Sequence, residues 1–290
     1  MSSVGPTMPT LLRRGLNLLR TLNVRVQDLE SGSVVVSRRH GYEVVPLGRG
    51  SWVVRRGRPD DVHHDHKAVM AHLAAEHVVS LLHHYRVGCV LDVGANTGQY
   101  AKQLRRYGYR GRIVSFEPVP EITEKLRTAA ADDPDWHVYP YALGREDRTD
   151  TINVVYGSMS SMLGPSDFGT TRYKRFRDSR EEKIEVRRLD GLLDKVLDGL
   201  DDPRPYLKMD TQGFDLEAYA GGGERVHEFV GLQSEVALMQ IYEGMPRMDE
   251  AVSVYEADGF EITGMYPVTR EETTGRVLEF DCVMARADKL

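Results

Sequence analysis

From Gly88 to the C-terminus, short apolar segments alternate with longer segments whose apolar residues recur at helical spacing. Strands that read as continuous apolar runs must be buried on both faces. The alternation therefore predicts an α/β fold with a mainly parallel seven-stranded sheet between two layers of helices. A polar turn around 273–275 makes the last two strands an antiparallel hairpin. The expected strands are Cys89–Val93, Ile113–Phe116, Trp136–Tyr141, Tyr206–Met209, Gly231–Val236, Phe260–Met265 and Glu279–Ala285.

Residues 1–67 show a different pattern and are expected to form an α+β extension ahead of one domain at 68–290. Leucines recur among arginines over 10–22, which predicts a short amphipathic helix. We expect this helix to pack on the domain, and contact with a second subunit in a homodimer or with lipid are the alternatives. The other elements expected here are strands at Ser33–Ser37, Tyr42–Pro46 and Ser51–Val54, a polar loop at Arg55–Asp65 and a helix at Ala68–Tyr85.

One connection is too long for an ordinary turn. Residues 157–180 are rich in Ser, Gly, Arg and Tyr, and they lie between two strand-like segments, Thr151–Val155 and Lys183–Val186. A connection of this length is either disordered or a functional loop over a site.

Composition narrows the classes of partner. The 290 residues carry a net charge of −6, with +5 over residues 1–70 and −11 over the rest. An acidic chain argues against nucleic acid as the main partner, because phosphate binding needs a concentrated basic surface. No apolar run is long enough for an integral membrane segment, and the N-terminus lacks the pattern of a signal peptide. The two cysteines, Cys89 and Cys282, lie in apolar strands, so buried thiols and a cytoplasmic location are expected.

The strongest motif is a strand that ends in a glycine loop, at residues 90–100. Gly94 and Gly98 allow a tight turn and close approach to a ligand, and the helix that starts near Thr97 offers free N–H groups. Asp92 directly precedes the loop. A carboxylate here repels a phosphate group but suits the ammonium group of S-adenosylmethionine.

A second acidic residue, Glu117, ends the next expected strand, 25 residues after Asp92. A carboxylate at this point can accept both hydroxyls of a ribose, which indicates an adenosine-containing cofactor. The loop spacing is GxxxG, not the GxGxxG of dinucleotide-binding loops, and no GK[ST] follows as in a P-loop. S-adenosylmethionine is therefore favoured over NAD.

Several sequence blocks in fixed order resemble the FkbM family of S-adenosylmethionine-dependent methyltransferases. They are DVGANTGQY at 92–100, FEP at 116–118, YALG at 141–144, KMDTQGFDLEAYAGG at 208–222, Ser234-Glu235 and IYEGMP at 241–246. The resemblance implies a Rossmann-like class I methyltransferase fold and methyl transfer to oxygen, often on a sugar or natural product. Some family members carry Glu at the positions of Gln212 and Asp215.

The resemblance also implies roles for further residues. Asn96 and Thr97 are expected at the carboxylate end of the cofactor, and Ala142 near the adenine. Asp210 and Glu235 follow neighbouring strands of the expected sheet, where ligands collect. The two carboxylates either share a proton, with one serving as general base, or bind a divalent cation such as Mg²⁺, or hold loop amides.

A histidine is the other candidate base. The group His63, His64 and His66 is either a site for a metal or base or an ordinary polar loop. The long loop is expected to cover the acceptor, and its candidate lining residues, which otherwise form a solvated basic surface, are Tyr156, Arg172, Tyr173, Arg175 and Arg177.

Together these features predict an O-methyltransferase acting on a hydroxyl of a saccharide or glycosylated metabolite. One alternative is a scaffold that binds the cofactor without turnover. Another is an NAD-dependent nucleotide-sugar dehydrogenase.

Overall fold

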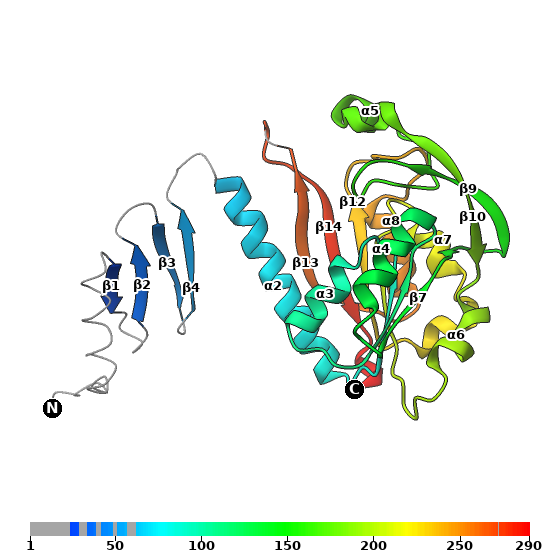
Figure 1. Cartoon of the computed structure of the whole chain (residues 1–290), viewed down its shortest axis with the longest axis horizontal. Coiled ribbons are helices and arrows are strands. Elements are labelled where there is room, and N and C mark those ends of the chain that lie inside the picture. The colour runs from blue at the N-terminus through cyan, green and yellow to red at the C-terminus, as the bar shows by residue number, and fades with distance from the viewer. Residues whose placement is uncertain (1–23, 29–33, 39–41, 49–50, 57–61, 272) are drawn as a thin grey trace. The chain divides into compact units, whose positions relative to one another are not determined.

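The computed structural model describes residues 24–28, 34–38, 42–48, 51–56, 62–271 and 273–290, with side chains from Val69 onward (Figure 1). The chain divides into two compact units, Met1–Val69 and Met70–Leu290. The helix predicted over 10–22 lies outside the described residues, and so does its expected role in a homodimer.

The first unit contains two antiparallel strand pairs. β1 (Val24–Asp28) pairs with β2 (Val34–Arg38), and β3 (Tyr42–Gly48) pairs with β4 (Ser51–Arg56). The predicted loop at Arg55–Asp65 is wrong at both ends, because β4 extends to Arg56 and α2 (Val62–His84) begins before His63. The histidine-rich segment is therefore helical, and its side chains lie outside those described.

The second unit is built on a seven-stranded sheet in the order β13-β14-β12-β11-β5-β6-β7. All neighbouring strands are parallel except β14, which runs antiparallel to both β12 and β13. The predicted α/β fold with its C-terminal hairpin is confirmed. The strands are β5 (Cys89–Val93), β6 (Arg112–Phe116), β7 (Trp136–Tyr139), β11 (Tyr206–Met209), β12 (Gly231–Ala237), β13 (Glu261–Arg270) and β14 (Val277–Ala285).

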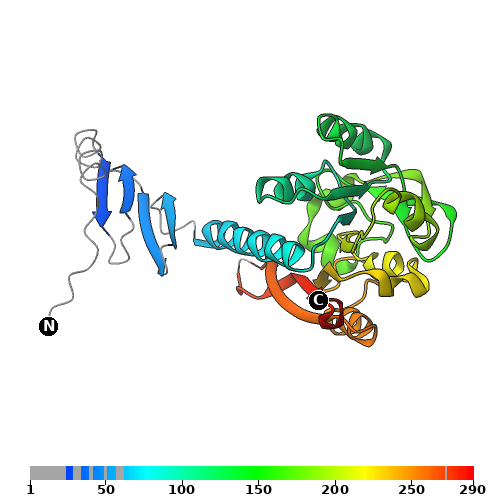
Figure 2. The same ribbon diagram turned by 90° about the horizontal axis from the view of Figure 1, so that it is seen from below.

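Helices cover the sheet on both of its faces (Figure 2), and alternate side chains of the strands belong to two separate cores. Leu91 of β5 packs in one core with α6 (Asp190–Leu197), α7 (Asp215–Ala220), the 3₁₀ segment η3 (Gly223–Glu228) and α8 (Met248–Ala257). Val90 packs in the other core with α2, α3 (Gln99–Arg106) and α4 (Pro120–Ala130). The strands have continuous apolar sequences because both of their faces are covered.

Both cysteines are fully buried in this sheet. Cys89 begins β5 and Cys282 lies in β14, and neither forms a disulfide. Burial raises the pKa of each thiol to about 12, so both stay protonated at neutral pH.

A second, three-stranded sheet lies beside the first, in the order β8-β10-β9. Its strands are β8 (Ala142–Leu143), β9 (Arg148–Val154) and β10 (Arg180–Arg187). The long connection between β9 and β10 is ordered, with α5 (Asp167–Arg172) and the 3₁₀ segment η2 (Lys174–Asp178). Its Phe176 is buried against Tyr242 and Met245 from the segment after β12, so this connection has a small core of its own.

Candidate functional site

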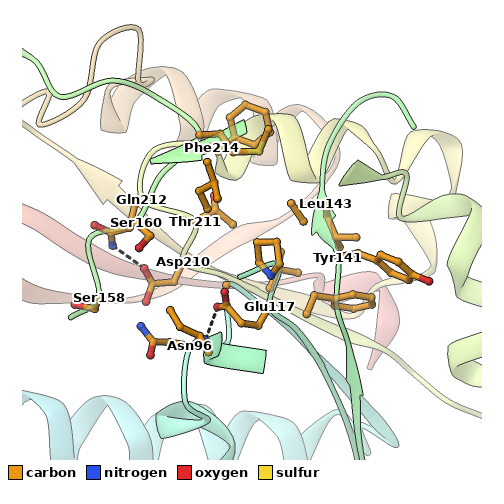
Figure 3. Close-up of a pocket in the computed structure, with 18 residues that line it drawn as sticks. Asn96, Glu117, Tyr141, Leu143, Ser158, Ser160, Asp210, Thr211, Gln212 and Phe214 are labelled. Atoms are coloured by element: carbon orange, nitrogen blue, oxygen red, sulfur yellow. Dashed lines mark hydrogen bonds between the residues drawn. The ribbon is translucent and has the colours of Figure 1, made fainter. Parts of the chain in front are cut away.

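A pocket lies at the carboxyl ends of β5, β6 and β11 and encloses about 590 Å³ including its mouth (Figure 3). Its walls are apolar near Ile122, Leu143 and Phe214 and polar near Asp210. The remaining lining residues are Val93, Gly94, Asn96, Phe116, Glu117, Pro118, Tyr141, Ala142, Ile152, Ser158, Ser160, Met162, Thr211 and Gln212.

The two glycines of the loop after β5 are required for different reasons. Gly94 has a φ of +76°, and a Cβ there would lie 2.1 Å from the backbone carbonyl oxygen of Asp210. Gly98 has a φ of +83°, and a Cβ there would lie 2.6 Å from the Trp136 ring. Gly94 thus lets the β5 and β11 loops meet beneath the pocket, whereas Gly98 lets α3 pack on β7.

Glu117 is held in place by two backbone amides. The N–H of Asn96 donates to its Oε2, and the N–H of Val119 donates to its Oε1, each at 3.0 Å. Burial raises the pKa of Glu117 to about 7, although both hydrogen bonds oppose the shift. Each carboxylate oxygen keeps a free lone pair, so Glu117 can still accept hydrogen bonds from a vicinal diol in the pocket.

Asp92 does not line this pocket. The parallel register of β5 and β11 places Asp92 directly opposite Lys208, and the Lys208 Nζ lies 3.0 Å from Asp92 Oδ1. Burial alone would lower the pKa of the Lys208 ammonium, but the charges of Asp92 and Asp210 outweigh it and raise this pKa. The result is a buried ion pair behind the pocket, and a role of Asp92 toward the cofactor's ammonium group stays a prediction.

Asp210 lies beyond the end of β11 and Glu235 lies near the end of β12, and the amide of Gln212 joins them. Gln212 Nε2 donates to Asp210 Oδ1 and to Glu235 Oε2, each at 2.9 Å. Asp210 lines the pocket, whereas Glu235 does not. Burial, and next the charge of Asp210, raise the pKa of Glu235 well above its ordinary value. Burial therefore favours the protonated form of Glu235.

A third carboxylate, Asp215, secures the loop that carries Gln212. It accepts hydrogen bonds from the backbone N–H and hydroxyl of Thr211 and from the hydroxyl of Ser234. The role of holding loop amides, left open for Asp210 and Glu235, is thus performed here by Asp215.

The predicted cofactor residues divide into two groups. Gly94, Asn96, Glu117 and Ala142 line the pocket together, whereas Asp92, Thr97 and Gly98 do not. Sequence reasoning missed Gln212 as a site residue and also missed the aromatic walls Tyr141 and Phe214. The only signal for them was their place in the family blocks, since nothing local separates them from core or loop residues.

Within the described part of the chain, no histidine lines this pocket, which leaves Asp210 as the candidate base. That part of the chain also contains no group of three or more His, Cys, Asp or Glu residues placed to hold a metal ion. The divalent-cation alternative therefore has no ligand set among these residues. No helix in residues 62–271 and 273–290 is long and apolar enough to cross a bilayer.

A wider, polar pocket adjoins the first and shares Asn96, Ile122 and Ser158 with it. Thr97 and the exposed Tyr156 line it, as do Lys125 and Arg180. Of the loop residues predicted to cover an acceptor, Tyr156 alone lines either of these two pockets, among the residues described. Tyr173 instead packs against the small core around Phe176.

Residues 92–253 match the family model of the methyltransferase FkbM domain. The chain belongs to the FkbM methyltransferase family. It is 25% identical over 199 residues to methyltransferase sdnD of Sordaria araneosa, covering 60% of this chain and 74% of that protein. The match to this family favours methyl transfer over the dehydrogenase alternative.

Two solved structures are similar to this family member. Aeropyrum pernix fibrillarin with natively bound S-adenosyl-L-methionine has a TM-score of 0.40 at 15% identity, covering 91% of this chain and 94% of that one. Magnesium protoporphyrin IX methyltransferase of Synechocystis PCC 6803 has a TM-score of 0.40 at 10% identity, covering 80% and 86%.

Proposed function

We propose that this protein is an S-adenosylmethionine-dependent O-methyltransferase whose acceptor is a hydroxyl of a saccharide or a glycosylated natural product. The observation that carries the proposal is the arrangement of one pocket, with the Glu117 carboxylate on one wall and the Asp210 carboxylate on another. Membership of the family supports methyl transfer. The proposal that the acceptor atom is oxygen rests on the Asp210 carboxylate in the pocket, which can take the proton of a hydroxyl.

The pocket residues fit S-adenosylmethionine by their chemistry. Glu117 has free lone pairs for the two ribose hydroxyls, and Ile122, Leu143 and Phe214 form apolar walls suited to an adenine. Asn96 and Asp210 supply the polar surface that the amino-acid portion requires. When bound, this cofactor supplies an electrophilic methyl group on a sulfonium.

A hydroxyl is a weak nucleophile, so a base that takes its proton as the new C–O bond forms accelerates the transfer. Asp210 is the candidate, since its side chain is 41% exposed and lines the pocket. The Lys208 ammonium lies 3.6 Å from Asp210 Oδ2. Burial favours the protonated form of Glu235, and in that form Glu235 does not compete for the proton of the acceptor. The apolar walls exclude water while the hydroxyl oxygen is aligned with the methyl carbon.

The adjoining polar pocket suits a polyhydroxylated acceptor. Tyr156 is 93% exposed there, and a free aromatic face beside hydroxyl and carboxylate groups is a common platform for a sugar ring. Glu121 pairs with both Lys125 and Arg180, and Glu182 also pairs with Arg180, so two carboxylates balance the two cations of this pocket. A neutral saccharide is therefore favoured over an anionic one.

The test is release of S-adenosylhomocysteine from the purified full chain, measured with a panel of mono- and oligosaccharides and glycosylated metabolites. Turnover with at least one hydroxylated acceptor, and a methyl ether in the product by mass spectrometry, is the expected result. Tight binding of S-adenosylmethionine without turnover on any acceptor would favour the scaffold alternative. A parallel assay with a chelator measures metal dependence.

A further inference from the structure

Gln212 connects four separate segments of the chain at the wall of the pocket. Its amide donates to Asp210 and Glu235, its Oε1 accepts from the Tyr242 hydroxyl at 2.9 Å, and its backbone carbonyl accepts from the Ser161 hydroxyl at 2.7 Å. Its backbone has a φ of +55°, which is uncommon for a residue other than glycine. A strained backbone of this kind persists where the surrounding contacts determine it.

The orientation of the Gln212 amide follows from the groups around it. The ionised Asp210 carboxylate can only accept hydrogen bonds, and a protonated Glu235 still accepts at its unprotonated oxygen, so the NH₂ group faces both acids. The amide oxygen then faces Tyr242, whose hydroxyl can donate. All three polar positions of the amide are occupied, and none of them is free to turn toward a ligand.

We propose that Gln212 is a positioning residue that holds Asp210 in its ionised, proton-accepting form, and that Tyr242 sets the orientation of Gln212. This inference rests on the proposed function, in which Asp210 is the base. A hydrogen bond donated to the ionised form of an acid favours that form. Without the amide, the ionised form of Asp210 would lose the hydrogen bond donated to its Oδ1 and would be less favoured.

The charges around Asp210 and Glu235 make the hydrogen bonds from Gln212 necessary. Lys208 is the cation within ion-pair distance of Asp210, and it also neutralises Asp92. Three further acidic groups act on this pair from two other elements, namely Asp215 of α7 and both Glu279 and Asp281 of β14. Because carboxylates are in excess here, the two N–H groups that Gln212 donates have a strong effect on which carboxyl group is protonated.

The same contacts tie the acceptor side of the pocket to the base. The Tyr242 hydroxyl lies 3.0 Å from the carbonyl oxygen of Met159, and the Ser161 hydroxyl bonds to the Gln212 carbonyl. Met159 and Ser161 follow Ser158, which lines both pockets. A displacement of this segment would therefore reach Asp210 through Gln212.

The test is the variant Gln212→Met, which keeps the length of the side chain and the backbone conformation but removes both N–H donors. We expect kcat/KM at neutral pH to fall about tenfold or more and the acid limb of its pH profile to move up by about one unit, with activity recovering at high pH. The dissociation constant for S-adenosylmethionine should stay within about twofold. A loss that is the same at every pH would overturn the proposal.

Tyr242→Phe should shift the acid limb in the same direction by a smaller amount. The matched control is Tyr219→Phe, which removes a buried hydroxyl that donates to Asp258 at 2.7 Å, outside this network. The control should leave the pH profile unchanged. An equal shift in both tyrosine variants would mean that the effect is general destabilisation.

A second readout separates this inference from the proposed function. In ¹³C NMR titrations of the cofactor-free protein labelled at its side-chain carboxyls, Gln212→Met should move protonation of the pocket carboxyls to higher pH. If the wild-type protein lacks turnover while this shift is present, the proposed function fails and the role of Gln212 stands. If the carboxyl titrations of wild type and variant coincide, the role of Gln212 fails.

Discussion

Glu235 of β12 and Asp281 of β14 are directly opposite each other in an antiparallel strand pair. Two buried carboxyl groups this close disfavour the ionisation of both. Burial, and next the charge of Asp210, raise the pKa of Asp281 to about 6, and a hydrogen bond from Gln233 only partly offsets the shift. The acidic side chains that β12 and β14 carry behind the pocket therefore lower the free energy of unfolding when they are ionised.

Asp281→Asn should stabilise the protein at alkaline pH. The folded chain binds the Asp281 proton more tightly than the unfolded chain does, so the free energy of unfolding falls as the pH rises from about 4 to 6. Removing the charge should recover roughly 1 to 2 kcal/mol above pH 7 and almost nothing at pH 4. Thermal melts at both pH values measure this, and a lower Tm for the variant at pH 8 would contradict it.

Glu117→Gln should weaken cofactor binding and remove its pH dependence. The amide has one acceptor fewer for a diol and cannot accept from both Asn96 and Val119. We expect a loss of about tenfold to a hundredfold in affinity for S-adenosylmethionine. Because the pKa of Glu117 is about 7, wild-type affinity should fall as the pH drops below 7. Calorimetry between pH 5.5 and 8.5 tests this, and an equal slope in the variant argues against Glu117 as the titrating group.

Asp210→Asn should reduce turnover on the order of a hundredfold or more, because an amide cannot accept the proton of the acceptor hydroxyl. Cofactor affinity should change little. Steady-state kinetics together with a binding titration separate these effects. An equal loss of cofactor binding would mean that Asp210 serves the cofactor and not the acceptor.

Gly94→Ala should destabilise the protein far more than the matched variant Gly199→Ala. Both glycines have a φ of +76°, but a Cβ at Gly199 meets nothing within 4 Å, whereas one at Gly94 meets the Asp210 carbonyl oxygen. The left-handed backbone alone costs about 1 to 2 kcal/mol, so any larger loss in urea unfolding measures the collision. Similar losses for the two variants would show that the β11 loop moves aside easily.

Lys208→Met should destabilise the protein by about 3 to 5 kcal/mol, because Asp92 would be left as an uncompensated buried charge. Adding Asp92→Asn should restore part of the loss. A double-mutant cycle by chemical denaturation measures the coupling between the two residues. Strict additivity of the two substitutions would exclude the buried ion pair as the source of the effect.

The sheet could be predicted well because its signal is local. The apolar runs at Cys89–Val93 and Tyr206–Met209 coincide with β5 and β11 to the residue. The strand β8 was missed because two residues carry little pattern of their own, and β1 was missed although it is as long as β5. The sequence did not show that residues 157–180 form an ordered segment, because their small core depends on Tyr242 and Met245, which lie far away in the sequence.

The site shows the same division. Glu117 and Asp210 were found because the carboxyl ends of parallel strands meet at one edge of the sheet. Asp92 was assigned to the cofactor from its place before a glycine loop, and that role stays a prediction. Its ion pair with Lys208 follows from the parallel register of β5 and β11, which the sequence does not contain. Gln212 depends on three partners from three distant segments.

Because both thiols are buried, their reaction with an alkylating reagent measures how fast the sheet unfolds. Cys89 lies in a central strand and Cys282 in the antiparallel hairpin, and the chain has no other cysteine. The rate of alkylation at each cysteine therefore measures how fast its part of the sheet becomes exposed. Peptide mass spectrometry measures the two rates separately. If the hairpin detaches before the parallel strands separate, Cys282 will be labelled first.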